Sequence, residues 1–377
     1  MSPDVMQFLG RGVLLMSQAS QDLIVHQSAP LNAEPPLDRL RASFVTPIER
    51  FYIRSHGSIP RLDFDQHHLK VNGLVGRPLE LSMRELQERF PRKTVMATLQ
   101  CAGNRRSELN EVRPVTGTKW EPGAIGNAEW AGAALADVLG YAGVQQADAG
   151  KLHVAFDSVD EIQNEGDRFS YGASIPLVKA LQGEVLLAYE MNASPLTPEH
   201  GFPLRVIVPG YIGARSVKWL AGIRVQDEPS SNYFQQKDYK LFPSDMNQEN
   251  VDWEAGMMLY DIPVNAVICE PGEGVELPAG PVIVRGYAIA GGRSIARVEI
   301  SADQGQNWAR AAFEHPRGEP WTWTLWESRL DLPPGEHELT VRAWDRAAQT
   351  QPEEAEHIWN FKGFMNNAWH QVHFRTR

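Results

Sequence analysis

The pattern of apolar residues changes partway along this chain of 377 residues. Up to Trp219, short strand-like and helical segments are interleaved, which is typical of a mixed α/β or α+β domain. After about Val251, helical periodicity nearly vanishes, and short alternating strands follow one another between turn-rich segments. Strands of this kind over about 110 residues indicate an immunoglobulin-like β-sandwich. The sequence therefore predicts two domains of different class, which suits its length.

The boundaries follow from local composition. Residues 1–47 are predicted to form an extended N-terminal segment, because residues 28–47 are rich in proline, alanine and polar side chains. The first domain then covers residues 48–250, and the β-sandwich covers residues 251–377. Within the first domain we expect strands at 94–100, 153–156, 184–189 and 204–208, and helices at 82–90, at 131–140 and after Ser174. Within the sandwich we expect strands at 282–289, 297–301, 321–326 and 337–344.

Charge limits the partners that this surface can bind. The chain has 47 acidic and 36 basic residues and a formal net charge of -11, which disfavours nonspecific binding to nucleic acid or to an anionic membrane. The apolar stretch at residues 8–16 is too short for a membrane span, and residues 1–27 show no export signal. We therefore expect a cytoplasmic protein without a nucleic-acid or membrane partner.

Cys101 is the first candidate for chemistry. The run at residues 94–106, TVMATLQCAGNRR, predicts a strand that delivers a thiol into a loop beside two arginines, and nearby cations favour a thiolate. Cys101 could be a buried structural residue, a nucleophile as in a phosphatase, or a ligand to a soft or high-valent metal. A phosphatase loop would need more glycine and a helix start after Arg106, and neither is evident. The second cysteine, Cys269, is interpreted as structural.

Basic residues at strand ends and in glycine-containing loops point to local anion recognition, because guanidinium groups pair with oxyanions at two points. They are Arg54, Arg105, Arg106, Arg205, Arg215 and Lys218. Arg205 is the one charge in an apolar run, so it needs a partner. A surface salt bridge remains an alternative for each of them. His56, taken alone, is more simply a hydrogen-bonded structural histidine.

Four ungapped segments carry a resemblance to a known family. They are residues 99–106 (LQCAGNRR), 171–176 (YGASIP), 186–192 (LLAYEMN) and 200–219 (HGFPLRVIVPGYIGARSVKW). These segments resemble the sulfite oxidase family of molybdenum enzymes, which includes eukaryotic assimilatory nitrate reductase. The resemblance extends from about Phe51 to His373. It implies an α+β fold, with a molybdopterin-binding domain of the sulfite oxidase type followed by an immunoglobulin-like dimerisation domain.

The resemblance also implies roles for individual residues. Cys101 matches the protein ligand to molybdenum. The residues that match cofactor-binding positions are Tyr52, Arg54, His56, Cys101, Asp160, His200, Arg205, Ser216, Val217 and Lys218. Arg54 and Arg106 match arginines of the substrate oxyanion pocket, and Tyr239 matches a tyrosine beside the metal. Residues 359–363 (WNFKG) match a segment that in sulfite oxidases resembles Trp-Asn-Leu-Arg-Gly, and Lys362 takes the place of its arginine. The resemblance therefore implies an anion pocket that keeps the positive charge but loses the planar guanidinium fork.

The implied activity is oxidation of sulfite to sulfate by oxygen-atom transfer on molybdenum and molybdopterin. Electrons would pass to an external acceptor, either a cytochrome, another acceptor or oxygen, because no haem or flavin module is expected around residues 51–373. A homodimer is also implied. One alternative is a reductase of nitrate or of an S- or N-oxide on the same cofactor. Another, of a different class, is a non-catalytic cofactor-binding or redox-partner subunit.

Overall fold

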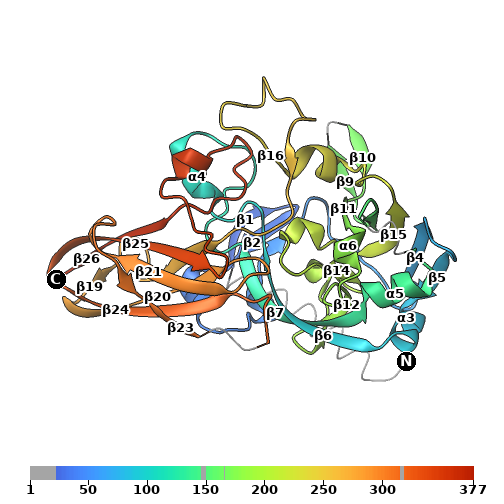
Figure 1. Cartoon of the computed structure of the whole chain (residues 1–377), viewed down its shortest axis with the longest axis horizontal. Coiled ribbons are helices and arrows are strands. Elements are labelled where there is room, and N and C mark those ends of the chain that lie inside the picture. Colours follow the sequence, from blue (N-terminus) through green and yellow to red (C-terminus); the bar gives the residue numbers. More distant parts are fainter. Residues whose placement is uncertain (1–22, 146–149, 165, 315–317) are drawn as a thin grey trace.

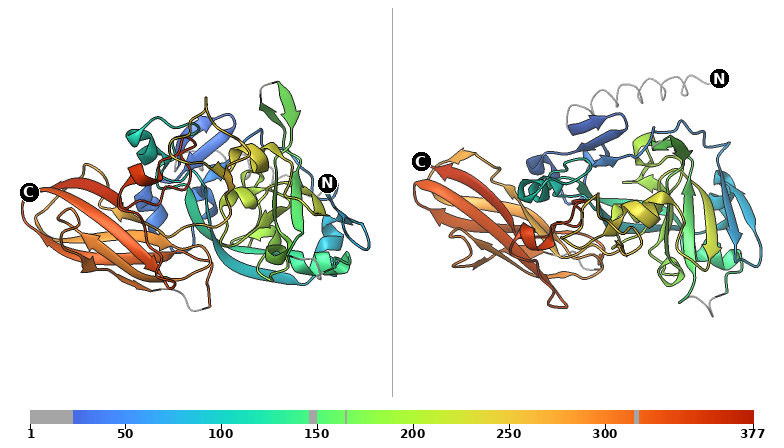
Figure 2. Two further views of the ribbon diagram at one scale, coloured as in Figure 1. Left: turned by 45° about the horizontal axis from the view of Figure 1, so that its top comes forward. Right: turned by 90° about the horizontal axis from the view of Figure 1, so that it is seen from above.

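A computed structural model describes residues 23–145, 150–164, 166–314 and 318–377. The chain forms a mixed α+β part and a β-sandwich that lie side by side along the long axis (Figure 1). Figure 2 shows the same division from two further directions, with the sandwich in orange and red. Within the described ranges, no helix combines the length and the apolar composition that crossing a membrane requires.

The α+β part is built on two sheets. The first has the order β11-β8-β15-β4-β5, from Gly172–Pro176, His153–Ser158, Leu220–Gln226, His68–Gly73 and Leu79–Ser82. The second has the order β13-β12-β7-β6, with β14 also on β12, from Ser194–Pro195, Leu186–Met191, Ile125–Ala134, Arg92–Gln100 and Arg205–Ile207. Apolar residues of both sheets, including Leu69, Ile175 and Val206, share one buried cluster. Burial of this apolar surface holds the two sheets together.

Short helices and small strand pairs connect these sheets. The α-helices are α2 (Leu37–Arg41), α3 (Met83–Arg89), α4 (Arg106–Val112), α5 (Leu135–Tyr141) and α6 (Leu177–Ala180). The 3₁₀ turns are η1 (Ile48–Arg50), η3 (Pro198–His200), η4 (Gly213–Arg215) and η6 (Ala355–Ile358), and η5 (Phe234–Asp238) is a π-helix. Two small pairs are β9 (Ile162–Asn164) with β10 (Asp167–Phe169), and β16 (Lys240–Leu241) with β17 (Met257–Met258).

The capping box that opens α3 is confirmed. The Ser82 hydroxyl accepts from the Glu85 amide while the Glu85 side chain accepts from the Ser82 amide. Two other helix predictions are wrong in part. Residues 131–134 belong to strand β7, because β6 and β12 flank it on both sides and supply its hydrogen bonds. Ser174 lies within strand β11, and α6 begins after Pro176.

The C-terminal part is a two-sheet sandwich, as predicted. One sheet has the order β18-β20-β24-β23, from Asn265–Glu270, Gly280–Ile289, Thr324–Leu332 and Ala312–Glu314. The other has the order β19-β26-β25-β21-β22, from Glu276–Leu277, His370–Thr376, Gly335–Asp345, Ile295–Ser301 and Ala309–Arg310. Inward-facing residues such as Val284, Val298, Trp326 and Val341 form its separate core. The predicted strand at 321–326 begins only at Thr324.

The N-terminal segment differs from the extended segment that its composition predicts. Residues 24–41 form strand β1 (Ile24–Ser28), strand β2 (Leu31–Glu34) and helix α2, and β2 pairs with β3 (Ile53–Arg54). Asn32, Ala33 and Glu34 are buried, so the hairpin is held by contacts with the α+β part that local composition does not reveal. The apolar stretch at residues 8–16 lies outside the described residues.

Candidate active site

The predicted site residues gather around one cavity in the α+β part. All of them except Arg106 and Lys362 line it: Tyr52, Arg54, His56, Cys101, Asp160, His200, Arg205, Ser216, Val217, Lys218 and Tyr239. They come from the segment around β3, the end of β6, the turn after β8, the segment from η3 to β15 and the end of η5, where Tyr239 lies. Segments far apart in sequence thus meet at one place, which the topology of the two sheets makes possible.

Cys101 lies just beyond the end of strand β6, with 5% of its surface exposed. Its Sγ accepts a hydrogen bond from the Gly103 amide at 3.4 Å. Burial raises the pKa of the thiol, and the opposing effect of Arg54 and Arg106 does not overcome it. Arg54 and Arg106 favour the thiolate, as nearby cations should, but desolvation is the larger effect on the pKa of Cys101.

The loop after Cys101 also differs from a phosphate cradle. Helix α4 begins directly at Arg106, although its sequence carries no capping signal. The amides of Asn104, Arg105 and Arg106 donate to the carbonyls of Cys101, Glu121 and Gly103 at 3.0, 3.2 and 3.1 Å. These amides are occupied within the protein, so they cannot bind a phosphate as a phosphatase loop does. The phosphatase alternative is therefore disfavoured.

Arg205 and Lys218 bring positive charge to one end of the cavity. Arg205 donates from Nη1 to the His200 carbonyl at 2.9 Å and from Nη2 to the Ser216 carbonyl at 3.1 Å, while its buried Nε has no partner. Lys218 donates from Nζ to the Glu199 carbonyl at 2.9 Å and to Ser55 Oγ at 3.2 Å. Burial lowers the pKa of Arg205 to about 10 and that of Lys218 to about 7.

The remaining residues of this end are uncharged or hydrogen-bonded. Burial, followed by Lys218 and Arg205, lowers the pKa of His200 to about 3, so its ring is neutral and lies 3.3 Å from the Ile48 carbonyl. Ser216 Oγ accepts from the Val208 amide, and Asp160 Oδ1 accepts from the Tyr171 amide. Val217 contributes an apolar wall. A Cβ on Gly213 would lie 2.6 Å from the Tyr52 hydroxyl, so only glycine fits there.

At the other end, Tyr239 and His56 form a hydrogen-bonded pair, with the Tyr239 hydroxyl 2.9 Å from His56 Nε2. Burial and then Arg54 lower the pKa of His56 well below its usual value, and burial raises the pKa of Tyr239. Both groups are therefore neutral near pH 7. The His56 ring also stacks on Tyr171, with centroids 4.8 Å apart, which fixes its orientation.

Arg106 and Lys362 lie behind the cavity wall. Arg106 donates from Nε to the Gly363 carbonyl at 3.1 Å and from Nη1 to the Thr118 carbonyl at 2.9 Å. Lys362 forms an ion pair with Asp238, the residue before Tyr239. Neither cation lines the cavity in this structure, so direct contact of either residue with a substrate stays a prediction.

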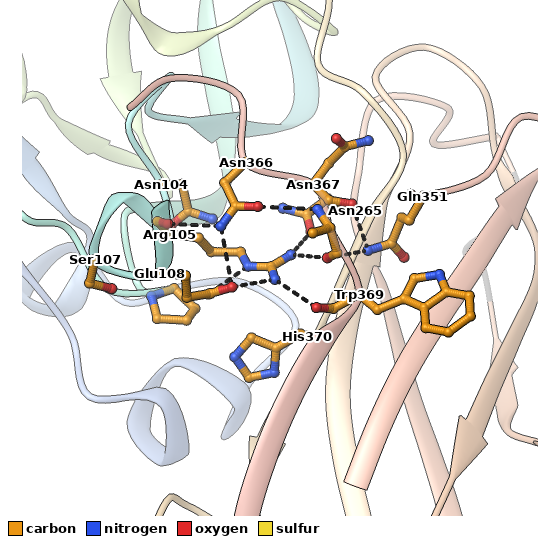
Figure 3. A network of polar contacts seen from close by, with 12 residues as sticks. Asn104, Arg105, Ser107, Glu108, Asn265, Gln351, Asn366, Asn367, Trp369 and His370 are labelled. Atoms are coloured by element: carbon orange, nitrogen blue, oxygen red, sulfur yellow. Dashed lines mark hydrogen bonds and ion pairs between the residues drawn. The ribbon is translucent and has the colours of Figure 1, made fainter. Parts of the chain in front are cut away.

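Arg105 and Arg215 lie away from the cavity, contrary to the grouping of basic residues in the sequence. Figure 3 shows Arg105 directed into the junction with the sandwich. There it pairs with Glu108 at 2.6 Å and donates from Nη1 to Asn265 Oδ1 at 2.7 Å and to the Ala368 carbonyl at 2.8 Å. Arg215 donates to the Leu259 carbonyl and to Gln235. The fold satisfies every guanidinium nitrogen of Arg105, whereas the buried Nη2 of Arg215 lacks a partner among the described residues.

Four residues at the site were not identified from the sequence. Asn32 accepts a hydrogen bond from Arg54, and the Ser55 hydroxyl and the Glu199 carbonyl both accept from Lys218. Asp238 forms an ion pair with Lys362. Ser55, Glu199 and Asp238 are adjacent in sequence to the predicted residues Arg54, His200 and Tyr239, and this adjacency was the available signal. The contact of Asn32 with Arg54 spans 22 positions, so local sequence does not indicate it.

The donor set fits an anionic cofactor that carries its own metal ligands. Arg54, Arg205 and Lys218 form no ion pair with the residues that the structure describes. Asp238 acts on Arg54, and Asp160 and Glu199 act on Lys218, only at longer range, so this charge is at most partly offset. The described ranges contain no cluster of three or more His, Cys, Asp or Glu side chains that could hold a metal. One thiol among unpaired cations therefore suits a metal that reaches the protein already bound to a larger anionic group.

Comparison with known proteins agrees with this arrangement. Residues 56–234 match the oxidoreductase molybdopterin binding domain, and residues 256–377 match the Mo-co oxidoreductase dimerisation domain. The chain is 44% identical over 371 residues to sulfite oxidase from Arabidopsis thaliana, a match that spans 94% of both proteins. It is 42% identical to mitochondrial sulfite oxidase from Rattus norvegicus, covering 94% of this chain and 66% of the rat protein.

Two further similarities define the breadth of the family. The chain is 40% identical to nitrate reductase [NAD(P)H] from Hordeum vulgare, covering 91% of this chain and 40% of the barley protein. The crystal structure of the sulfane dehydrogenase SoxCD from Paracoccus pantotrophus superposes with a TM-score of 0.77 and 25% identity, covering 94% of this chain and 88% of that one. The chain thus belongs to the sulfite oxidase family of molybdopterin-dependent oxidoreductases.

Proposed function

We propose that this protein oxidises sulfite to sulfate on a molybdenum–molybdopterin cofactor and passes the electrons to an external acceptor. The observation that carries the proposal is one cavity in which a buried thiol, Cys101, faces cations without carboxylate partners. Sulfite is a small dianion, and uncompensated guanidinium and ammonium groups bind such anions. The similarity to sulfite oxidases over nearly the whole chain supports the same substrate.

The residues divide into two groups by what they would hold. Cys101 would bind the metal, because a bound metal displaces the proton from a buried thiol. The end formed by His200, Arg205, Ser216, Val217 and Lys218, with Asp160 and Tyr52, would hold the anionic part of the cofactor. An anion there would supply the partner that Arg205 Nε lacks and would favour the charged form of Lys218. When bound, the cofactor supplies the redox chemistry of oxygen-atom transfer.

The chain's own contribution to the reaction is orientation and charge. Arg54 lines the cavity and forms no ion pair with a described carboxylate, so it would bind the substrate oxygens. Tyr239 keeps its proton and can donate a hydrogen bond to an oxygen, while the neutral His56 ring holds its hydroxyl in place. Arg106 and Lys362, behind the wall, would add positive potential at longer range.

The assembly and surroundings complete the proposal. We infer a homodimer, supported by the match of residues 256–377 to the dimerisation domain of the family. We also infer a cytoplasmic location and an acceptor that is a separate cytochrome, another oxidant or oxygen. Optical spectra and metal analysis of the purified protein would test the expectation that haem and flavin are missing.

The second candidate function is reduction of nitrate or of an S- or N-oxide on the same cofactor. It is favoured by the similarity to barley nitrate reductase and by Lys362, which takes the place of the arginine in the matching segment of sulfite oxidases. A non-catalytic cofactor-binding subunit is a weaker alternative, because Arg54, His56 and Tyr239 still converge on the cavity.

One experiment separates these functions. Protein purified from a host that makes the cofactor is analysed for molybdenum and then assayed twice, for ferricyanide reduction with sulfite and for nitrate reduction with reduced viologen. We expect molybdenum and turnover with sulfite. Turnover with nitrate alone would favour the reductase, molybdenum without either activity would favour the non-catalytic subunit, and protein without molybdenum would contradict the cofactor assignment.

A further inference from the structure

We propose that Asn32, in the N-terminal hairpin, is a positioning residue that holds Arg54 ready for the substrate anion. The proposal rests on the proposed function in one respect, that Arg54 is the group that binds the anion. Asn32 lies before residue 56, where the match to the molybdopterin binding domain begins. The hairpin would therefore belong to the substrate site, although the sequence predicts an extended segment there.

The amide of Asn32 has a complete set of hydrogen bonds. Its side chain is fully buried, and its Oδ1 accepts from Arg54 Nη1 at 3.1 Å and from the Ser55 amide at 3.0 Å. Its Nδ2 donates to Gln27 Oε1 at 3.1 Å and to the Pro30 carbonyl at 3.0 Å. A primary amide has two donor hydrogens and two acceptor lone pairs, and all four are used.

This set also fixes the direction of the amide. If the oxygen and nitrogen of Asn32 exchanged places, the NH₂ group would face the Arg54 guanidinium and the Ser55 amide, which are themselves donors. The oxygen would then face the Gln27 and Pro30 oxygens. The hairpin thus presents an acceptor to Arg54 in one orientation only.

Backbone pairing adds a second constraint on Arg54. Strands β2 and β3 are antiparallel, and Asn32 is the direct partner of Arg54, with Ala33 opposite Ile53. The same residue therefore controls both the backbone position of Arg54 and the direction of its side chain. Ser55, the next residue, accepts from Lys218 Nζ through its hydroxyl, so the fixed backbone also reaches the cofactor end of the cavity.

The chemistry of the contact explains why an amide suits this position. Nη1 of Arg54 donates to neutral acceptors, Asn32 Oδ1 and the Ser55 carbonyl at 2.7 Å, so the guanidinium is oriented without being neutralised. Within the described residues, Nε and Nη2 of Arg54 make no hydrogen bond to the protein, so they are available to an anion in the cavity. A carboxylate at position 32 would keep the acceptor that faces Arg54, but it would lose the two donors to Gln27 and Pro30, and its charge would compete with the anion for Arg54.

The test compares two substitutions with a matched control in the same hairpin. Asn32→Asp keeps the acceptor and adds a charge, Asn32→Ala removes the acceptor, and Gln27→Ala removes only a group on the far side of the amide. For each molybdenum-loaded protein, sulfate affinity is measured by titration calorimetry, KM and kcat are measured for sulfite, and the denaturation midpoint is recorded. Sulfate is used because it reports anion binding without turnover.

We expect Asn32→Asp to raise the sulfate Kd and the sulfite KM by at least about tenfold, because the added carboxylate charge competes with the anion for Arg54. Asn32→Ala should raise both by about three- to tenfold through lost pre-organisation, with a smaller change in kcat. Gln27→Ala should stay within about twofold of wild type. If Asn32→Asp does not fold, Asn32→Ala decides the question.

Wild-type sulfate affinity and sulfite KM in both Asn32 variants would overturn the proposal. A lower denaturation midpoint or molybdenum content with unchanged sulfate affinity would overturn it too, because it would make the role purely structural. Failure of the proposed function looks different: wild-type protein would bind sulfate, and Asn32→Asp would weaken that binding, but sulfite would not be oxidised. That result would support the positioning role while rejecting the substrate.

Discussion

The cavity and the junction between the two parts treat buried cations in opposite ways. At the junction, every guanidinium nitrogen of Arg105 has a partner: Nε and Nη2 donate to Glu108, Nη1 to Asn265 and to the Ala368 carbonyl, and Nη2 also to the Trp369 carbonyl at 3.4 Å (Figure 3). In the cavity, Arg54 and Lys218 have only neutral acceptors, and Arg205 Nε has none.

This difference shows that closeness to Cys101 in the sequence does not identify a ligand-binding cation. Arg105 is four positions from Cys101 in the chain, yet its hydrogen bonds and charge are satisfied by the fold. Arg205 is far away in sequence and lines the cavity with an unused donor. A cation that lines the cavity without an ion pair is therefore a better signal of an anion site than its place in the sequence. An unsatisfied donor alone is not enough, because the buried Nη2 of Arg215 also lacks a partner among the described residues, although Arg215 does not line the cavity.

The largest expected effect on sulfite turnover comes from replacing Cys101, the thiol of the cavity. Cys101→Ser should reduce sulfite turnover by about a thousandfold or more, because it removes the proposed metal ligand. Since Cys101 is a small buried side chain, the denaturation midpoint should change little. Steady-state assays with ferricyanide, metal analysis and denaturation measure the three quantities. Turnover that is retained in Cys101→Ser would place the reacting centre elsewhere, and the cavity would then not differ from the junction in the way described above.

Arg105→Met should show the opposite profile, with a large loss of stability and little effect on anion binding. Glu108 and Asn265 would lose their cationic partner at a site where Arg105 has no exposed side-chain surface. Breaking such a pair costs about 3–5 kcal/mol of the free energy of unfolding. Denaturant titration measures this, with Arg84→Met as the control.

Arg84 is a suitable control because its pair with Asp65 is exposed, with 69% and 65% of the side chains accessible, so its loss should cost less than about 1 kcal/mol. The sulfite KM of folded Arg105→Met should remain within about twofold of wild type. A raised KM with unchanged stability would show that Arg105 acts on the anion after all, as its place in the sequence suggests.

Asp238→Asn tests a cation that lies between these two extremes. Lys362, contributed by the C-terminal part of the chain, is neutralised by Asp238 beside Tyr239, and both side chains are mostly buried, at 12% and 16% exposed. Without the carboxylate charge, the positive potential of Lys362 next to the cavity is no longer offset. Sulfate binding should therefore become about three- to tenfold tighter at low salt. The gain should shrink at higher ionic strength.

Lys362→Met is the matched control for Asp238→Asn, because it leaves the carboxylate and should weaken sulfate binding instead. Calorimetry with sulfate at two salt concentrations measures both variants. If neither variant changes the affinity, the ion pair lies outside the anion site. The replacement of arginine by lysine at position 362 would then have no bearing on substrate choice.

Local signals explain which parts of this molecule could be predicted. Ser82 and Glu85 form their capping box within three residues, and the strands of the sandwich alternate regularly, so their sequence is sufficient. The opposite directions of Arg105 and Arg106 could not be predicted. They depend on a left-handed φ of 65° at Arg105, in a residue bound by groups from residues 265 and 368.

Longer contacts explain the remaining failures. Residues 131–134 have helical spacing but lie in β7, because pairing with β6 and β12 outweighs intrinsic propensity. The hairpin at residues 24–34 is fixed by pairing with β3, and Asn32 meets Arg54 across 22 positions of sequence. The site could be identified from the family motifs, whereas the residues that hold it in place required the structure.

The smallest expected effect concerns a cation whose charge depends on pH. His26 Nε2 lies 2.5 Å from Glu34 Oε1 in the N-terminal hairpin, and Glu121 is the other acidic group that acts on it. The hydrogen bond to Glu34 raises the pKa of His26 above 6.5, and burial raises the pKa of Glu34 above 4.5. The folded state therefore holds more protons than the unfolded state.

The contribution of the His26–Glu34 pair to stability should consequently fall as the pH rises, opposite in sign to that of the histidines whose pKa is lowered by burial. The contribution of His26 is fully present below pH 6.5, its unfolded pKa, and is lost as the pH passes through the raised value of the folded state. His26→Gln should remove about 1 kcal/mol of the difference in unfolding free energy between pH 6 and pH 8.5. Denaturant titration at the two pH values measures it, with His357→Gln, a histidine whose side chain is 68% exposed, as the control. An equal change in unfolding free energy between the two pH values in wild type and His26→Gln would show that the pair makes no pH-dependent contribution.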